Sequence, residues 1–350
     1  MKLEKRPDVD YNKLDEIIVN YSDNLKVFYI LKSSIDLKLY DYLNEYKSFE
    51  EISDIINIKP ILSHYILEIL SKIDIIKKKD GLYKNSRLAD AYLNTDSLYS
   101  KTKGFILAFE RVKLWEDLIK TMKGNIKRED NDHFPLIIQV MAENTISGDL
   151  YDVVNLVNDL NEFKKAKKFL EIGGGHGFYT IALNDLNPNM EAYVFDLENV
   201  IKETKKYIEK YDSKVKTISG DFYIDDFGEN YDIIFSSYNP SGKNPDVAKK
   251  VHKSLNVGGL FITKQYFPLE KEGNDLKELL DNFEWNLADL TKSRKGKRAY
   301  VFKNDLCFKN YISFLEELGF EIIGTHNVLD ISPFTTATAN DKIIIAKKLK

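Results

Sequence analysis

The stretch that decides the fold is FLEIGGGHGFY, residues 169–179. A short apolar run ends there in an acid, and glycine then fills four of the six positions from 172 to 177. Glycine has no Cβ and tolerates positive φ, so a glycine-rich turn between a strand and a helix leaves room for a ligand against bare amides. The pattern therefore predicts a strand, a ligand-binding turn and a helix.

Two residues narrow the chemistry of that ligand. The dinucleotide fingerprint G-x-G-x-x-G, started at Gly173, requires glycine at position 178 and meets Phe178 instead. A carboxylate such as Glu171 would repel a pyrophosphate, but it suits a ligand that carries an ammonium or sulfonium charge. S-adenosylmethionine is a ligand of this kind.

Length and composition favour a two-domain globular protein. The chain has 350 residues, of which 43% are hydrophobic and 30% charged. A net charge of −4 argues against nucleic acid as a partner, and the single cysteine, Cys307, excludes an internal disulfide. The start MKLEKRPDVDY has no apolar signal-peptide core, and no later apolar run is long enough to span a membrane. We therefore expect a cytoplasmic protein without a membrane partner.

The N-terminal part has the pattern of a winged helix. Apolar residues recur at helical spacing from Asn24 to about Leu93, and Ser48 and Glu51 have the spacing of a capping box. A further helix follows at Pro60–Lys72, and KKKDGLYKN predicts a hairpin. Winged helices often bind DNA, but this last helix is mainly apolar and has one basic residue, near its end. A packing or dimerisation role is therefore favoured over DNA binding.

The C-terminal half alternates short β runs with helices. The β runs are KFLEI, EAYVFD, KVKTIS, YDIIFSS and GLFITKQYF, followed by FEIIGTHNVL and KIIIAKK. This alternation predicts a Rossmann-like α/β fold whose mostly parallel sheet has an antiparallel C-terminal edge and binds ligands at the carboxyl ends of its strands. The expected domains are a winged-helix domain at 1–100, a helical linker at 101–165 and the Rossmann-like domain at 166–350.

These motifs carry a family resemblance that covers nearly the whole chain. ILKSSIDLKLYDYL, DGLYKNS and LWEDLIKTMKGN precede EIGGGHG, VFDLENV, GDFY and NVGGLFI. In this order they resemble the S-adenosylmethionine-dependent O-methyltransferases of the caffeic acid and hydroxyindole type. The resemblance implies a class I methyltransferase domain and a homodimer formed through the N-terminal winged-helix domain. It also implies methyl transfer to a small-molecule acceptor, with S-adenosylhomocysteine as product.

The cofactor positions each have a physical interpretation. Asp196, about 20 residues beyond the glycine turn, can accept hydrogen bonds from both ribose hydroxyls, or it can cap the helix that follows. Asp221 would accept from the adenine amine while Phe222 packs on the ring; the alternative is a turn aspartate beside a core phenylalanine. The cofactor-binding residues implied are Glu171, Gly173, Gly175, Gly177, Asp196, Leu197, Asp221, Phe222, Ser236 and Lys264.

The chain departs from the family at two catalytic positions. Plant-type members have a histidine after the fourth strand that takes the proton from a phenol, and here Asn239 aligns with it. Gln265 aligns with a glutamate at the end of the fifth strand. Asparagine cannot act as a general base, so the acceptor would be an already ionised or carbon nucleophile. The alternatives are a non-methylating reaction on the same fold, or a non-enzymatic winged-helix regulator that senses the cofactor.

Signals for the acceptor and for a metal are weak. The acceptor chamber would be shaped by Met141, Tyr238, Asn239, Trp285 and Asn286, although such side chains are more often plain core. The basic run Lys292–Arg298 would attract an anionic acceptor or form a solvated loop. His176 is expected to face a helix or solvent rather than to act as a base. The other histidines lack metal-ligand spacing, so no metal is expected; they are His64, His133, His252 and His326.

Overall fold

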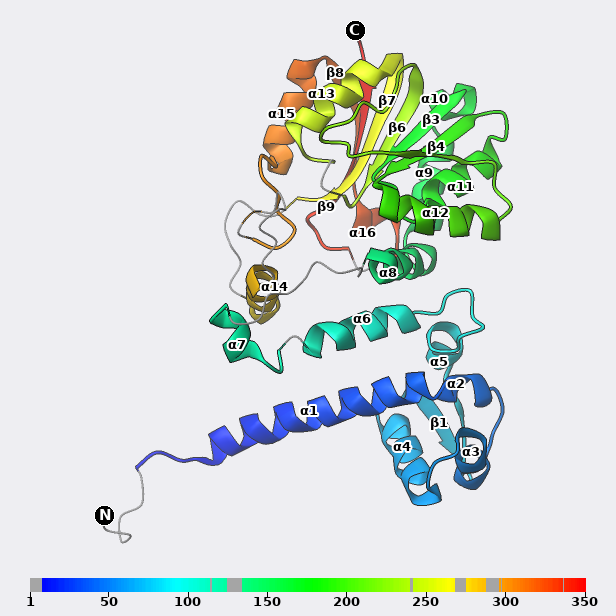
Figure 1. The fold of residues 1–350 in the computed structure, drawn as a ribbon, viewed down its shortest axis with the longest axis vertical. Coiled ribbons are helices and arrows are strands. Elements are labelled where there is room, and N and C mark those ends of the chain that lie inside the picture. The colour runs from blue at the N-terminus through cyan, green and yellow to red at the C-terminus, as the bar shows by residue number, and fades with distance from the viewer. Residues whose placement is uncertain are drawn as a thin grey trace. The chain divides into compact units, whose positions relative to one another are not determined.

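The structure, a computed structural model, divides into two compact units, Met1–Val112 and Lys113–Lys350 (Figure 1). It describes residues 8–113, 115–124, 134–239, 242–267, 275–287, 296, 298–335 and 337–350. Among these residues, no helix combines the length and the apolar character needed to cross a membrane.

The first unit contains the expected helices and hairpin. Its elements are α1 (Asn12–Asp36), α2 (Leu39–Tyr42), α3 (Phe49–Ile56), α4 (Pro60–Lys72), β1 (Ile76–Lys79), β2 (Leu82–Asn85), α5 (Arg87–Tyr92) and α6 (Thr102–Lys113). The capping box is confirmed, because Glu51 N donates to Ser48 Oγ at 3.2 Å and Ser48 N donates to a Glu51 oxygen at 2.7 Å. The hairpin turns at Asp80 and Gly81, both with positive φ. The winged-helix assignment of these elements stays a prediction.

The second unit begins with helices and continues as a sheet. The helices before the sheet are α7 (Leu118–Met122), α8 (Phe134–Ser147), α9 (Leu150–Asn158) and α10 (Asn161–Lys165). The strands are β3 (Lys168–Ile172), β4 (Glu191–Asp196), β5 (Lys216–Ser219), β6 (Tyr231–Ser237), β7 (Leu255–Tyr266), β8 (Phe320–Asn327) and β9 (Asp341–Lys348). The helices between them are α11 (Phe178–Leu186), α12 (Glu198–Lys210), α13 (Pro245–Ser254), α14 (Leu276–Leu287), α15 (Phe308–Leu318) and α16 (Val328–Ile331).

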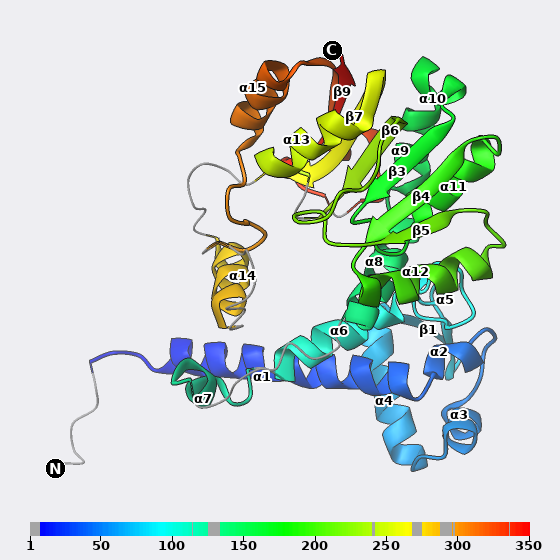
Figure 2. The ribbon, with the colours of Figure 1, turned by 45° about the horizontal axis from the view of Figure 1, so that its top comes forward.

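The seven strands are ordered β5-β4-β3-β6-β7-β9-β8. Strands β3 to β7 pair in parallel, and β9 runs antiparallel to both of its neighbours, β7 and β8. The predicted α/β fold with an antiparallel C-terminal edge is therefore confirmed. The strand order changes direction between β3 and β6, and the carboxyl ends of β3, β4 and β6 lie at one edge of the sheet (Figure 2). In sheets of this kind, ligands bind at that edge.

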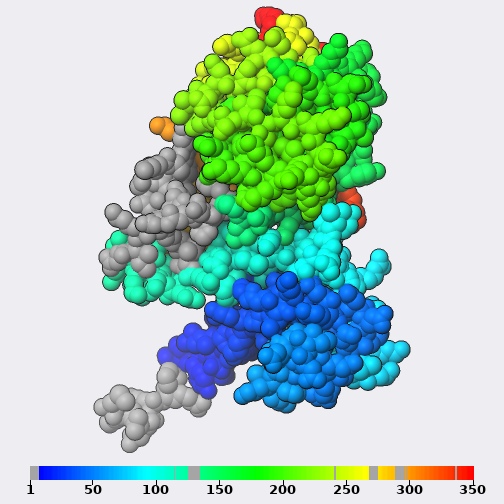
Figure 3. Space-filling view, turned by 45° about the vertical axis from the view of Figure 1, so that its right-hand side comes forward, coloured from blue at the N-terminus to red at the C-terminus, as the bar shows by residue number. Residues whose placement is uncertain are grey.

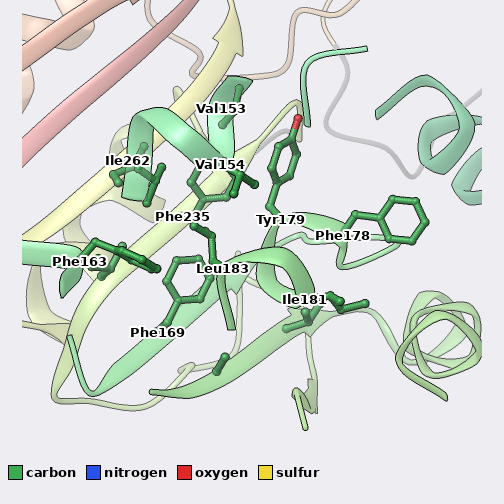
Figure 4. Close-up of a cluster of buried hydrophobic side chains, with 14 of the residues drawn as sticks. Val153, Val154, Phe163, Phe169, Phe178, Tyr179, Ile181, Leu183, Phe235 and Ile262 are labelled. Atoms are coloured by element: carbon green, nitrogen blue, oxygen red, sulfur yellow. The ribbon is translucent and has the colours of Figure 1, made fainter. Parts of the chain in front are cut away.

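Side chains alternate between the two faces of the sheet along each strand, and each face carries one apolar cluster. Phe169 faces α9 to α11 in one cluster, whereas Leu170 and Ile172 face α13 and α15 in the other. Figure 4 shows the first cluster, in which Phe169 and Phe235 lie among side chains of α9 and α11. Glu171 shares the face of Phe169, so this acid is directed into the protein at the end of β3.

Candidate functional site

The glycine turn joins β3 to α11 in the predicted way. Gly173, Gly175 and Gly177 all have positive φ, at +62°, +54° and +73°. Gly177 is the N-cap residue of α11. The predicted sequence of strand, turn and helix is confirmed, and glycine is needed at these positions because other residues rarely adopt this backbone conformation.

Gly173 offers a test of how closely the turn is packed. A Cβ there would lie 2.8 Å from the Asn239 side chain, whereas a Cβ at Gly258, which has a similar positive φ, would meet nothing within 4 Å. Both alanine substitutions incur backbone strain, but only Gly173→Ala adds a steric clash. We expect Gly173→Ala to lower the free energy of unfolding by about 1–3 kcal/mol more than Gly258→Ala, measured by urea denaturation. Equal losses would show that the Asn239 contact is not tight.

Glu171 lies directly under the turn. It is 1% exposed, and one carboxylate oxygen accepts the Thr180 backbone N–H at 3.3 Å and also the Thr180 hydroxyl. A Cβ at Gly174 would lie 2.9 Å from the Glu171 carboxyl carbon. Burial raises the pKa of Glu171 to about 7. The acid therefore fixes the first turn of α11 against β3 and places a titrating negative charge beneath the glycine loop.

Asp196 connects the end of β4 to the same loop. One carboxylate oxygen accepts the Gly175 N–H at 2.9 Å and the other accepts the Leu197 N–H at 2.7 Å. Burial raises the pKa of Asp196 to about 6. The helix-cap alternative is wrong, because α12 has Leu197 as its N-cap residue and no side-chain cap bond. Each oxygen has a second lone pair that can accept a hydroxyl.

Asp221 and Phe222 follow β5, beside the end of β4. Asp196 pairs with Ser219 in the sheet, so Asp221 lies at the same edge. One Asp221 oxygen accepts the Tyr223 N–H at 2.8 Å, as in the turn interpretation. Phe222 is half-buried, and its ring centroid is 4.8 Å from that of Tyr223. Their adenine contacts stay a prediction.

The ends of β6 and β7 bring three predicted polar residues together. Asn239 Nδ2 donates to Ile172 O at 2.7 Å, Ser236 Oγ donates to Asn239 Oδ1 at 3.3 Å, and Gln265 Nε2 donates to Ser236 Oγ at 3.5 Å. Both residues at the altered catalytic positions, Asn239 and Gln265, thus belong to one hydrogen-bonded chain against the glycine loop. In this series of hydrogen bonds, the Asn239 side-chain amide binds the last residue of β3, Ile172.

Lys264 lies in a buried ion pair. It is 1% exposed, and its Nζ donates to Asp149 Oδ2 at 2.6 Å and to the Tyr179 hydroxyl at 2.5 Å. Tyr179 in turn donates to Asp149 Oδ1 at 2.7 Å, and Figure 4 shows its hydroxyl pointing out of the apolar cluster. Burial lowers the pKa of Lys264, which Asp149 partly offsets. We define these three residues as the buried triad; it joins β7, α11 and the corner between α8 and α9.

Sequence reasoning missed Asp149 and Tyr179. Asp149 precedes α9 by one residue without any motif, and Tyr179 occupies an apolar position of the helix that follows the glycines. Only their convergence on Lys264 reveals them.

His176 faces helices, as expected. Its Nδ1 accepts the Phe178 N–H at 3.1 Å, and its Nε2 lies 3.1 Å from the Thr145 hydroxyl on α8. Burial, with Lys264 nearby, lowers the pKa of His176 to about 3, so the ring is neutral. Ile138 of α8 would be 3.3 Å from a Cβ at Gly175, so α8 packs over the glycine loop.

The predicted acceptor residues come from three elements. Met141 lies half-buried on α8, and Tyr238 immediately follows β6. Trp285 and Asn286 lie on α14, where Trp285 Nε1 donates to Gly296 O at 2.9 Å and Asn286 Nδ2 donates to Asn282 O at 2.8 Å.

Other predictions fall partly outside the described residues. His133 is not described, and of the basic run Lys292–Arg298 only Gly296 and Arg298 are; Arg298 pairs with Glu278 at 3.3 Å. Within the described part of the chain, no three histidine, cysteine, aspartate or glutamate side chains form a metal-binding group.

Comparisons with known proteins agree with this geometry. The model of the O-methyltransferase domain family matches residues 128–273. The uncharacterized protein MJ0086 of Methanocaldococcus jannaschii is 43% identical over 336 residues, which cover 94% of this chain and 89% of that protein. An O-methyltransferase family protein from Burkholderia thailandensis has a similar fold, with a TM-score of 0.72, 14% identity, and coverage of 95% and 97% of the two chains. Human N-acetylserotonin methyltransferase, solved with SAM, gives a TM-score of 0.70 at 16% identity, with both chains fully covered.

The sheet order, the glycine loop and the acid at the end of β4 define a protein with the class I methyltransferase fold. Residues 128–273 match the O-methyltransferase domain family, and the chain is similar to MJ0086 along most of its length.

Proposed function

We propose that this protein is an S-adenosylmethionine-dependent methyltransferase that acts on a small-molecule acceptor in the cytoplasm. The observation that carries the proposal is the link between Asp196 and Gly175, which holds a buried carboxylate beside a loop of bare amides. This arrangement suits a ligand that has both hydroxyls and a positive charge.

The residues present fit that cofactor. Asp196 would accept the ribose hydroxyls, Asp221 and Phe222 would hold the adenine, and the backbone from Gly173 to Gly177 would line the methionine portion. Burial raises the pKa of Glu171 to about 7, and a cationic ligand bound over the loop would favour its ionised form. The cofactor, once bound, supplies a methyl group on a sulfonium. In-line positioning of the acceptor can then provide much of the rate.

Label transfer tests the proposal directly. The purified protein would be incubated with methyl-labelled S-adenosylmethionine and a small-molecule extract of the source cells, and label should appear in a small molecule. Tight binding of the cofactor without any transfer would favour a non-methylating reaction on the same fold. Salt-sensitive retention on DNA would favour the regulator.

We further propose that the protein is a homodimer formed through its first unit, and no nucleic acid or membrane partner is proposed. The supporting observation is apolar surface on α1 and its N-cap residue Tyr11, which is 73% exposed. On α1, Tyr21 is 65% exposed, and Leu14 and Ile18 are 60% and 57% exposed. The surface of this unit is drawn in blue and cyan in Figure 3. These residues recur every three to four positions, so they share one face of the helix, and an exposed apolar helix face typically marks a subunit interface.

Charge on α1 should therefore dissociate the dimer. The double substitution Leu14→Asp and Ile18→Asp would place carboxylates in the interface, and light scattering after size-exclusion chromatography should change from the dimer mass to the monomer mass. As a control, substitution of the exposed Asp15 by asparagine on the same helix should leave the dimer intact. A wild-type monomer at micromolar concentration would contradict the proposal.

A further inference from the structure

Lys243 is another buried lysine at the carboxyl edge of the sheet. Its side chain is 3% exposed, and its Nζ donates to the backbone oxygens of Tyr266 and Tyr300, both at 2.9 Å. The same Nζ lies 3.5 Å from Asp305 Oδ2, and the Asp305 side chain is 4% exposed. The ammonium group therefore has three acceptors, one at the end of β7 and two in the segment 300–305.

The buried charges favour one position of that segment. An ammonium group is costly to bury unless its hydrogen bonds are satisfied and its charge is paired. Burial lowers the pKa of Lys243, and the Asp305 carboxylate partly offsets this effect. Asp305 Oδ2 also accepts the Phe302 N–H at 2.9 Å. Movement of the segment away from β7 would leave both charges buried without their partners, which is strongly unfavourable.

The residue before Lys243 contacts the proposed acceptor site. A Cβ at Gly242 would lie 2.0 Å from Gln265 Nε2, so the Gly242 backbone lies directly against that side chain. Thr263 Oγ1 also donates to Gly242 O, at 2.8 Å. Gln265 belongs to the series of hydrogen bonds that reaches the glycine loop through Asn239. Lys243 thus follows a residue that is fixed beside both altered catalytic positions.

The segment held by Lys243 in turn packs against α14. The ring centroid of Trp285, on α14, lies 5.9 Å from that of Tyr300 and 5.7 Å from that of Phe302. Tyr300 is the residue whose backbone oxygen accepts from Lys243. Phe302 is the residue whose N–H donates to Asp305. The two rings that contact α14 are therefore fixed through their backbones by the ion pair.

Helix α14 has little apolar burial of its own. No residue of Leu276–Leu287 is buried, and Leu276, Leu279 and Leu280 are 63%, 52% and 46% exposed. Burial of an apolar face is what usually holds a surface helix in place. The position of α14 therefore depends strongly on the segment that Lys243 holds.

We infer that Lys243 is a positioning residue, which holds α14 beside the carboxyl edge of the sheet so that this helix forms part of the acceptor chamber. The inference rests on the proposed methyltransferase function and adds to it a residue that acts on the acceptor through α14. Its effect should fall on the acceptor and not on the cofactor, because the proposed cofactor contacts of Asp196 and the glycine loop do not involve α14.

Removal of both charges tests the positioning role. The double substitution Lys243→Met and Asp305→Leu leaves no unpaired charge of the pair, so the domain should stay folded. Its KM for the acceptor found in the extract should rise by about tenfold or more, with kcat changed by less than about threefold. Its affinity for S-adenosylhomocysteine, measured by calorimetry, should stay within about threefold.

A milder variant acts on the other side of the same contact. Phe302→Leu shortens the side chain that packs on Trp285 and leaves the ion pair in place. Its KM for the acceptor should rise in the same direction, by a smaller factor. If the double variant does not fold, an unchanged KM in Phe302→Leu would overturn the inference.

A further measurement does not depend on turnover. The chain has two tryptophans, and both report on α14: Trp285 lies on the helix, and Trp115 stacks on Phe283 with ring centroids 5.3 Å apart. In the double variant, quenching of the tryptophan emission by acrylamide should increase, whereas the far-UV circular dichroism should not change.

Lys348→Met is the matched control. Lys348 Nζ also donates to two backbone oxygens, of His252 at 2.6 Å and of Leu255 at 2.8 Å, at the amino end of β7. This variant should keep the wild-type KM and the wild-type quenching. A double variant with either the wild-type KM or the wild-type quenching would overturn the inference and leave the methyltransferase function standing. Absence of transfer by the wild type to any acceptor would overturn both.

Discussion

Replacing Lys264 by methionine should lower the free energy of unfolding by about 3–5 kcal/mol. Methionine keeps the length of the side chain but removes the charge that pairs with Asp149 at 2.6 Å. Both side chains of the pair are at least 93% buried, so the Asp149 carboxylate would be left in a low-dielectric interior without its cation. Urea denaturation monitored by circular dichroism would measure the loss.

A second substitution separates charge from packing. In Lys264→Met with Asp149→Leu, no buried charge remains, and most of the lost stability should return. Lys216→Met is the surface control: Lys216 pairs with Glu191 at 3.1 Å, both side chains are 58% exposed, and little change is expected. If the double variant is no more stable than the single one, the unpaired carboxylate is not the cause.

Replacing Asp196 by alanine should weaken binding of S-adenosylmethionine by more than about tenfold, since each hydrogen bond to a charged group contributes roughly 1.5–3 kcal/mol. Alanine removes the carboxylate that accepts the Gly175 N–H, and with it the proposed ribose acceptor. Calorimetry would measure the affinity. Asp232→Ala is the matched control, because Asp232 also accepts two backbone N–H groups, from Lys167 and Lys168, at the amino end of the strands.

The same carboxylate should make cofactor binding depend on pH. Burial raises the pKa of Asp196 to about 6, and the ionised form is the one that accepts from both ribose hydroxyls. Wild-type affinity should therefore fall as the pH is lowered from 7 through 6. Asp196→Asn, which cannot ionise, should lose this part of the pH dependence. Unchanged affinity in Asp196→Ala at pH 7 would remove the ribose assignment.

The elements that the sequence predicted correctly have strong local signals. KFLEI and EAYVFD are strands with the predicted bounds, because their apolar runs end abruptly at the glycine turn and at Asp196. The Ser48 capping box and the hairpin at Gly81 depend on contacts a few residues apart. The strand that ends in GLFITKQY begins at Leu255, earlier than predicted, because α13 ends at Ser254 and β7 begins at the next residue.

The predictions that failed or were incomplete involve distant partners. Helix capping by Asp196 was a reasonable local alternative, but the carboxylate instead accepts the N–H of Gly175, on the loop after the neighbouring strand. Lys264 was expected to complete the cofactor pocket, and this role stays a prediction; its Nζ donates to Asp149 and to the Tyr179 hydroxyl, neither of which was predicted. Nothing near residue 264 in the chain indicates either partner.

The sequence by itself determined the α/β class, the glycine turn and the acid that follows the next strand, because each is encoded by residues adjacent in the chain. Only the tertiary structure decided that Lys264 is neutralised by Asp149, more than a hundred residues earlier, and that Asp341 at the start of β9 lies opposite Tyr266 at the end of β7. The physical reason is that a parallel sheet gathers the carboxyl ends of distant strands at one edge, and its antiparallel β9 brings the start of that strand to the same edge. Which charged groups pair there depends on their distance in the folded protein, and this distance cannot be inferred from neighbouring residues in the sequence.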